Sequence, residues 1–205
     1  MNTMIIVLLS VALTLAISTL TGFCFSKGRF KGKGILLLII LSNMMIPFET
    51  KLMPTFLFVR ALGLTNTFMG VVLPGVLTTA MYIFFIKKFC DDLPNDLYEA
   101  GVIDGAGKFR IYWQIFLPLM GPVIATITIL NIMGCWNDLL WPLIILTKSN
   151  MKTIQIGLSI YSDQNVQHAG VATAMSVISV LPLTAMFIFL QKYIVQSIAA
   201  TGIKQ

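Results

Sequence analysis

The residues best suited to a specific chemical role lie in one polar segment, 88–118, between two long apolar stretches. Glu99 supplies a carboxylate near its centre. The spacing i, i+3, i+4, i+7 of a single helix face is kept by Leu97, Ala100, Gly101 and Asp104. Because small residues let another surface come close and a carboxylate can pair with a cation, this pattern predicts non-covalent docking, not bond-making chemistry.

Turn and capping residues predict a helix–glycine–helix elbow over residues 94–115 of this segment. Pro94 suits the first turn of a helix, and Asp96 places negative charge where the helix dipole favours it. Gly105 can take the left-handed conformation that ends a helix. A second short helix is expected from about Gly107 towards Ile115.

A second interpretation of this segment is an amphipathic helix lying on lipid headgroups. It accounts for the aromatic residues Phe89, Tyr98, Phe109 and Trp113. It does not account for five acids near an anionic surface, namely Asp91, Asp92, Asp96, Glu99 and Asp104. The docking elbow is the favoured prediction, and the interfacial helix stays open as the alternative.

The sequence does not predict an enzyme. It contains no Gly-x-x-x-x-Gly-Lys-Ser/Thr phosphate loop and no paired carboxylates or nucleophile–base set. Cys24, Cys90 and Cys135 lack metal-ligand spacing, and His168 has no ligand partners nearby in the sequence, so no cofactor or metal is predicted.

Composition places the chain in a membrane. Of its 205 residues, 57% are hydrophobic and 11% are charged, with a mean hydropathy of +0.89. Soluble domains carry about 25% charged residues, and lipid accommodates apolar surface that a domain of this size could not bury. The fold class predicted is all-α, a polytopic transmembrane helical bundle that forms one domain over residues 1–205.

Charge-free stretches predict five spans, at about 4–25, 34–50, 67–87, 119–141 and 169–191. The first is too long for the apolar part of a signal peptide and is predicted to be retained. Pro47 and Pro54 are expected to break or kink the end of the second span.

Lysine and arginine set the predicted orientation. Ten of them fall on one side: Lys27, Arg29, Lys31, Lys33, Lys87, Lys88, Lys108, Arg110, Lys192 and Lys204. Four fall on the other: Lys51, Arg60, Lys148 and Lys152. The positive-inside rule puts the larger set in the cytoplasm, so the N-terminus is expected outside and the C-terminus inside. The net charge of +6 then needs no nucleic-acid partner.

Polar residues inside spans usually face protein or a water-filled path. The candidates for a translocation path are Asn43, Asn131, Asn137 and Asp138, although Asn43 and Asn131 suit hydrogen bonds between helices better than ligand contacts. Trp136 and Trp141 are expected to anchor the membrane interface in preference to stacking on a bound ligand.

The docking segment resembles the EAA loop of ABC importer permeases. That pattern is Glu-Ala-Ala, three residues, Gly, nine residues, Ile-x-Leu-Pro. Its spacing is matched throughout, and the corresponding residues are Glu99, Ala100, Gly101, Gly105, Ile115, Leu117 and Pro118. Gly101 departs from the second alanine, which weakens helix propensity by roughly 1 kcal/mol.

Further segments resemble the carbohydrate-importing branch, and in particular the smaller membrane subunit of the maltose transporter. They are Arg29–Lys33, Met45–Pro47, Leu62–Thr67, Gly134–Leu143 and Leu190–Tyr193. Members of that branch usually have six spans, so this chain is expected to lack the first. A misplaced start codon, a truncated gene and a working five-span variant are all compatible with that difference.

The resemblance implies a permease subunit in a bacterial cell membrane, importing a sugar or oligosaccharide. Implied partners are a second permease subunit, a dimer of ABC ATPase subunits and an extracytoplasmic solute-binding protein, in addition to the lipid bilayer. Glu99, Ala100, Gly101, Asp104 and Gly105 would dock in the ATPase, and ATP hydrolysis would belong to that partner. The outer loop 146–167 would touch the binding protein.

Three rival functions remain. Half of an ion-driven secondary transporter would require inverted repeats and ionisable residues near mid-membrane, and the sequence offers neither plainly. A truncated fragment that never assembles would share every motif described. A membrane enzyme lacks a catalytic set.

Overall fold

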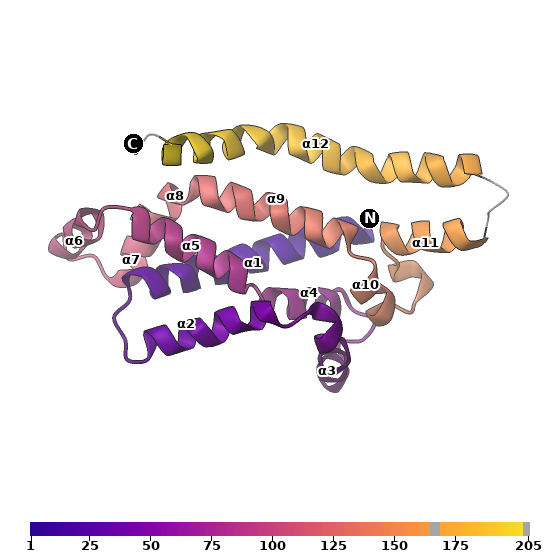
Figure 1. Ribbon diagram of the computed structural model, residues 1–205, viewed down its shortest axis with the longest axis horizontal. Coiled ribbons are helices and arrows are strands. Elements are labelled where there is room, and N and C mark those ends of the chain that lie inside the picture. The colour runs from indigo at the N-terminus through magenta and orange to yellow at the C-terminus, as the bar shows by residue number, and fades with distance from the viewer. Residues whose placement is uncertain (165–168, 203–205) are drawn as a thin grey trace. The chain divides into compact units, whose positions relative to one another are not determined.

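The computed structural model describes residues 1–164 and 169–202, and within them the chain is helical with no strand (Figure 1). The all-α prediction is therefore confirmed. His168 lies outside the described residues. The chain divides into two compact units, each assembled from segments far apart in sequence. Unit 1 comprises Met1–Ala12, Phe48–Leu77 and Ile129–Lys192, and unit 2 comprises Leu13–Pro47, Thr78–Thr128 and Tyr193–Gln205.

Unit 2 contains the segment predicted to dock. Its elements are the later part of α1 (Asn2–Lys27), α2 (Lys33–Ser42), η1 (Asn43–Met45), α5 (Ala80–Asp92), α6 (Asp96–Ile103), α7 (Lys108–Ile111), the π-helical turn η2 (Tyr112–Phe116), α8 (Leu117–Leu119) and the start of α9 (Gly121–Asn137). Its core brings together Phe23, Ile86, Cys90, Ile111, Tyr112, Phe116, Met120 and Ile127. One core thus holds α1, α5, the elbow and α9.

Unit 1 is built from the start of α1, the later part of α9 and six further elements. These are α3 (Phe48–Ala61), α4 (Phe68–Leu77), α10 (Leu140–Ile145), η3 (Ser149–Met151), α11 (Ile154–Gln164) and most of α12 (Ala169–Gly202). Val7, Ile132 and Trp136 form its buried cluster. Asn66 adopts a positive φ of 57° and its Oδ1 accepts hydrogen bonds from Thr147 N, Thr147 Oγ1 and Lys148 N, which ties the chain before α4 to the chain after α10.

One described helix, α1, is long and apolar enough to cross a membrane unaided. Up to four spans result if each of three interrupted helix pairs counts as one span. The second predicted span is interrupted at Ile46 and Pro47, and the third between α4 and α5. The count of five stays a prediction. Pro54 lies inside α3 and does not end it, so only Pro47 breaks the helix as expected.

Candidate functional site

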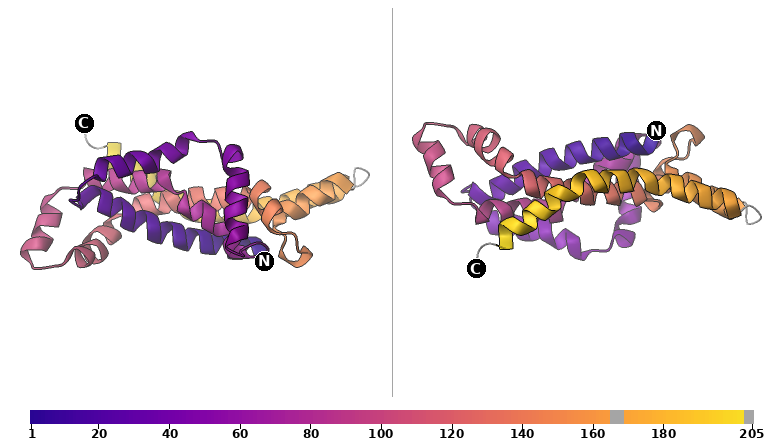
Figure 2. Two further views of the ribbon diagram at one scale, coloured as in Figure 1. Left: turned by 90° about the horizontal axis from the view of Figure 1, so that it is seen from below. Right: turned by 90° about the horizontal axis from the view of Figure 1, so that it is seen from above.

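The elbow forms as a short helix, a glycine turn and a second helical stretch. α6 runs from Asp96 to Ile103, and Gly105 follows with φ of +73°. The Gly105 N–H donates to the carbonyl of Val102, and the Ala106 N–H donates to that of Gly101. The predicted glycine stop is confirmed. Within unit 2, α6 lies beyond the end of α5 (Figure 1), and Figure 2 shows the elbow projecting from that end in two further views.

The elbow begins later than its sequence predicts. α5 continues to Asp92, because two i, i+4 pairs support its last turn, Lys87 with Asp91 and Lys88 with Asp92. Pro94 therefore precedes α6 instead of sitting in its first turn. The second helix is also not uniform: α7 passes into the π-helical turn η2 and then α8.

The face predicted for docking is split in two by the fold. Gly101 is buried against α7, and a Cβ placed on it would lie 2.9 Å from Ile111 Cγ1 and 3.1 Å from Ile115 Cδ1. The small size of Gly101 therefore serves packing inside the elbow, where the two helical stretches meet. Ala100 and Asp104 are exposed.

The outward surface of α6 combines charge and apolar area. The carboxylates of Asp96, Glu99 and Asp104 are on exposed residues. Val102 is 52% exposed and Ile103 is 85% exposed. This mixture of exposed apolar area and carboxylates is typical of a protein-binding surface. It does not suit a surface that lies on anionic lipid, because the carboxylates would be repelled.

The aromatic residues that suggested an interfacial helix do not act together. Phe89 and Tyr98 pack on the core of unit 2. Phe109 and Trp113 are exposed and stack with ring centroids 6.3 Å apart. Only the second half of the elbow thus retains the exposed aromatic pattern of an interfacial segment.

The last turns of α1 contact both ends of the elbow. At its start, Lys27 Nζ donates to Asn95 Oδ1 at 2.8 Å, and Ser26 Oγ donates to Asp91 Oδ1 at 2.7 Å. Burial alone would raise the pKa of the Asp91 carboxyl, but hydrogen bonds from Lys87 and Ser26, with the nearby lysine charges, hold that pKa below its ordinary value. Asp91 therefore remains a carboxylate acceptor.

At the end of the elbow, aromatic side chains make the contact. The Phe23 ring lies 5.4 Å from that of Tyr112 and 5.0 Å from that of Phe116, measured between centroids. The Tyr112 hydroxyl is 2.9 Å from Thr19 Oγ1. Residue spacing in the sequence does not single out Thr19 or Phe23 on α1. The one available signal was Lys27, the first charged residue after the apolar run.

The four candidates for a translocation path are distributed over both units. Asn43 opens η1 in unit 2. In unit 1, Asn131 is buried on α9, and Asn137 is exposed and accepts a hydrogen bond from Gln155 Nε2 at 3.5 Å. Asp138 Oδ1 accepts a hydrogen bond from the backbone N–H of Trp141, in the first turn of α10, at 3.3 Å.

The two tryptophans expected at the membrane interface are buried within unit 1, each 3% exposed. Trp136 Nε1 donates to the carbonyl of Ser179, and Trp141 Nε1 lies 3.3 and 3.2 Å from the carbonyls of Gly70 and Val71. The anchor prediction is wrong because each indole finds a backbone acceptor inside the protein.

Comparison with known proteins places this arrangement in a family. Residues 12–200 match the family described as the binding-protein-dependent transport system inner membrane component. The arabinooligosaccharides transport system permease protein AraQ of Halalkalibacterium halodurans is 34% identical over 203 residues, which cover 99% of this chain and 72% of that protein. The lactose transport system permease protein LacG of Rhizobium radiobacter is 30% identical over 195 residues, covering 95% and 71%.

A solved structure also matches this chain. A bacterial ABC transporter involved in the import of the acidic polysaccharide alginate has a chain that matches with a TM-score of 0.84 and 28% identity, covering 94% of this chain and 72% of that one. The fold of a transporter permease, its membrane location and its role as a transport subunit are therefore established for this sequence. The chain belongs to the family of binding-protein-dependent transport system inner membrane components.

Proposed function

We propose that this chain is a permease subunit of an ATP-driven importer for a sugar or oligosaccharide, and that its elbow docks in an ATPase subunit. The observation that carries the docking proposal is the exposed surface of α6. It presents Glu99, Ala100 and the 85% exposed Ile103 on a segment whose opposite side is packed into the core of unit 2. A partner can therefore bind the exposed side of α6 while its other side stays packed.

Each docking residue has a defined physical role in this proposal. Glu99 offers a charged contact to a basic residue of the ATPase groove, and Ala100 lets the groove wall approach. Asp104 and Gly105 form the bend that presents α6 outward. The connection from the elbow to α9 is formed by Ile115, Leu117 and Pro118. Ile115 packs against Gly101, and Leu117 and Pro118 lie in α8.

The proposed cycle is a two-state change biased by ATP. Closure of the ATPase dimer would move α6, and the elbow would transmit that movement to α5 and α9, to which the chain joins it. A second permease subunit would complete the path, and a solute-binding protein would deliver the sugar outside. The C-terminus and the elbow would lie in the cytoplasm, and the N-terminus would lie outside.

The substrate class rests on the relatives. Their names specify arabinooligosaccharides, lactose and starch degradation products. Neutral saccharides are recognised through hydrogen bonds, so amides are suitable contacts along the path. Asn137 is the first such candidate because it is exposed, and Asn43 and Asn131 are the other amides. The Asp138 carboxyl group, which can accept hydrogen bonds from sugar hydroxyls, is the fourth candidate.

The experiment is uptake of labelled arabinotriose, maltotriose and lactose by cells carrying the complete importer, with Glu99→Gln as the test variant. Losing a charge-assisted hydrogen bond costs about 1.5–3 kcal/mol, so co-purification of the ATPase and uptake should both fall by about tenfold or more. Glu49→Gln is the matched control, because Glu49 is an exposed acid on α3 in unit 1. Uptake unchanged in a Glu99→Gln, Gly105→Ala double variant would contradict the coupling role.

A further inference from the structure

We propose that the cytoplasmic end of α1 is a clamp that transmits the movement of the elbow into α1, with Lys27 as its positioning residue. This inference rests on the proposed coupling function. The chain itself joins the elbow only to α5 and α9. α1 ends at Lys27, far before α5 and α9 in the chain, and is not directly connected to the elbow. Movement of the elbow therefore reaches α1 directly only through side-chain contacts.

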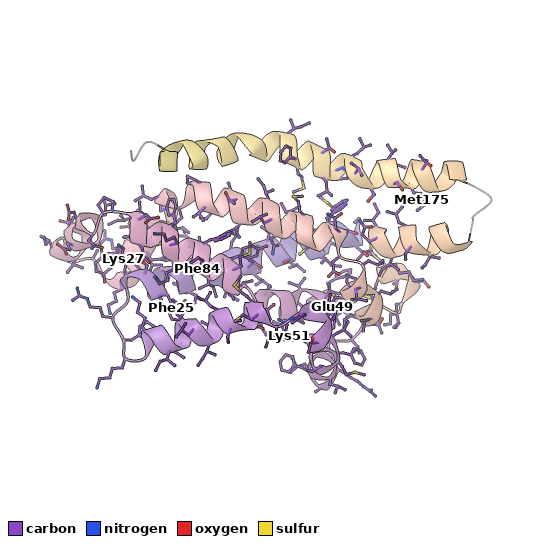
Figure 3. All side chains as sticks on the ribbon, in the orientation of Figure 1. Phe25, Lys27, Glu49, Lys51, Phe84 and Met175 are labelled. Carbon is purple, nitrogen blue, oxygen red and sulfur yellow. The ribbon has the colours of Figure 1, made fainter. Side chains whose placement is uncertain are left out.

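The first half of the clamp holds the start of the elbow. Lys27 Nζ lies 2.8 Å from Asn95 Oδ1 and 3.5 Å from the carbonyl of Leu93, which brackets the chain between α5 and α6. Ser26, one residue earlier, holds Asp91 at the end of α5. Lys27 comes from the last turn of α1 (Figure 3). Two neighbouring residues of α1 thus fix the base of α6.

The second half of the clamp holds the end of the elbow through a directed hydrogen bond. Thr19 Oγ1 lies 2.6 Å from the carbonyl of Leu15, and a carbonyl can only accept, so the single Thr19 proton is used there. The Tyr112 hydroxyl must therefore donate to Thr19 Oγ1, at 2.9 Å. Tyr112 is 5% exposed, so this donor has little access to other acceptors.

Between the two halves, Phe23 joins the parts of the elbow to α1. Its ring contacts Tyr98 of α6 at 6.5 Å as well as Tyr112 and Phe116 of η2. The Lys27 ammonium lies 5.6 Å from the centroid of the Phe116 ring, so one lysine touches both ends of the elbow. Because close-packed interiors transmit displacement, α1 and the elbow should move as one body.

Electron paramagnetic resonance can test directly, in the assembled importer, whether α1 and the elbow move together, by measuring the distance between two spin labels. Spin labels at Arg29→Cys, after α1, and at Lys108→Cys, at the start of α7, would both stand on exposed residues. Cys24→Ser removes the exposed native thiol. The clamp predicts the same distance distribution without nucleotide and with trapped ATP–vanadate. A distance that changes between those states in the otherwise native importer would overturn the proposal.

Substitutions then test whether Lys27 carries the movement. Lys27→Met keeps the apolar stem and removes the donor, so the distance distribution should broaden and sugar imported per ATP hydrolysed should fall by at least about fivefold, the lower end of typical coupling between sites. Lys27→Arg should restore most of the ratio, which a general loss of stability would not allow. Lys31→Met is the matched control, because it removes the same charge from an exposed residue outside the clamp.

Tyr112→Phe is the second variant if Lys27→Met fails to assemble. It keeps the ring against Phe23 and removes only the donated bond to Thr19. A native import-to-ATP ratio in whichever of the two variants assembles would refute the clamp. Failure of the ATPase to bind the unmodified permease would instead refute the proposed function. In that case the width of the label distance distribution in the permease alone, compared between the native Lys27 and Lys27→Met, would still report whether α1 and the elbow form one body.

Discussion

Replacing Gly105 by alanine puts a side chain on a residue whose φ is +73°. That left-handed conformation costs an L-residue with a Cβ roughly 1–2 kcal/mol relative to glycine. Nothing lies within 4 Å of the position that the new Cβ would occupy, so the whole penalty is conformational and no clash contributes. A penalty of that size disfavours the bent elbow by a factor of about 5–30.

The assay is the affinity of the ATPase subunit for the permease complex in lipid nanodiscs. Gly105→Ala should weaken it by up to that factor. Gly107→Ala is the control two residues away, since Gly107 has φ of −66° and open space around its Cβ position. Gly105→Asn should recover part of the affinity, because asparagine tolerates the left-handed region. Equal affinities for Gly105→Ala and Gly107→Ala would refute the reasoning that the bend presents α6.

Two further predictions concern unit 1. In Gly70→Ala the new Cβ would collide with the carbonyl oxygen of Leu64, so the backbone must shift and the thermal midpoint should fall by the equivalent of about 1–3 kcal/mol. Gly75→Ala, in the same helix with open space around its Cβ position, should not lower the midpoint, and a lowered midpoint there would contradict the prediction. Asn66→Ala removes the acceptor of three hydrogen bonds and strains a φ of 57°, so limited proteolysis should cut near Thr147 faster than in the unmodified chain; an unchanged cleavage rate would count against the proposed tie.

Local sequence rules predicted the parts of the site that depend on neighbouring residues. The stop at Asp104 and Gly105 follows from the conformational freedom of glycine and is found as expected. The start of α6 was predicted too early because the charge pairs of α5 extend that helix to Asp92.

The contacts that mount the elbow could not be predicted from spacing. Thr19 and Tyr112 are 93 residues apart, and Lys27 and Asn95 are 68 apart. Periodicity assigned Gly101 to a docking face because it records which residues share a side of a helix, but it does not record what that side packs against. The buried indoles of Trp136 and Trp141 were misjudged for the same reason, since their carbonyl acceptors come from distant helices.

Docking of α6 is tested most directly by a photo-cross-linking amino acid at Ile103, the 85% exposed residue at the end of that helix. Illumination of the assembled importer should give an adduct with the ATPase subunit, whereas the same amino acid at Leu38, which is 68% exposed on α2 in the second predicted span, should give none. A complex that retains its ATPase but yields no adduct from position 103 would contradict docking through α6. Labelling of Ile103→Cys by a membrane-impermeant thiol reagent outside intact cells would contradict it equally.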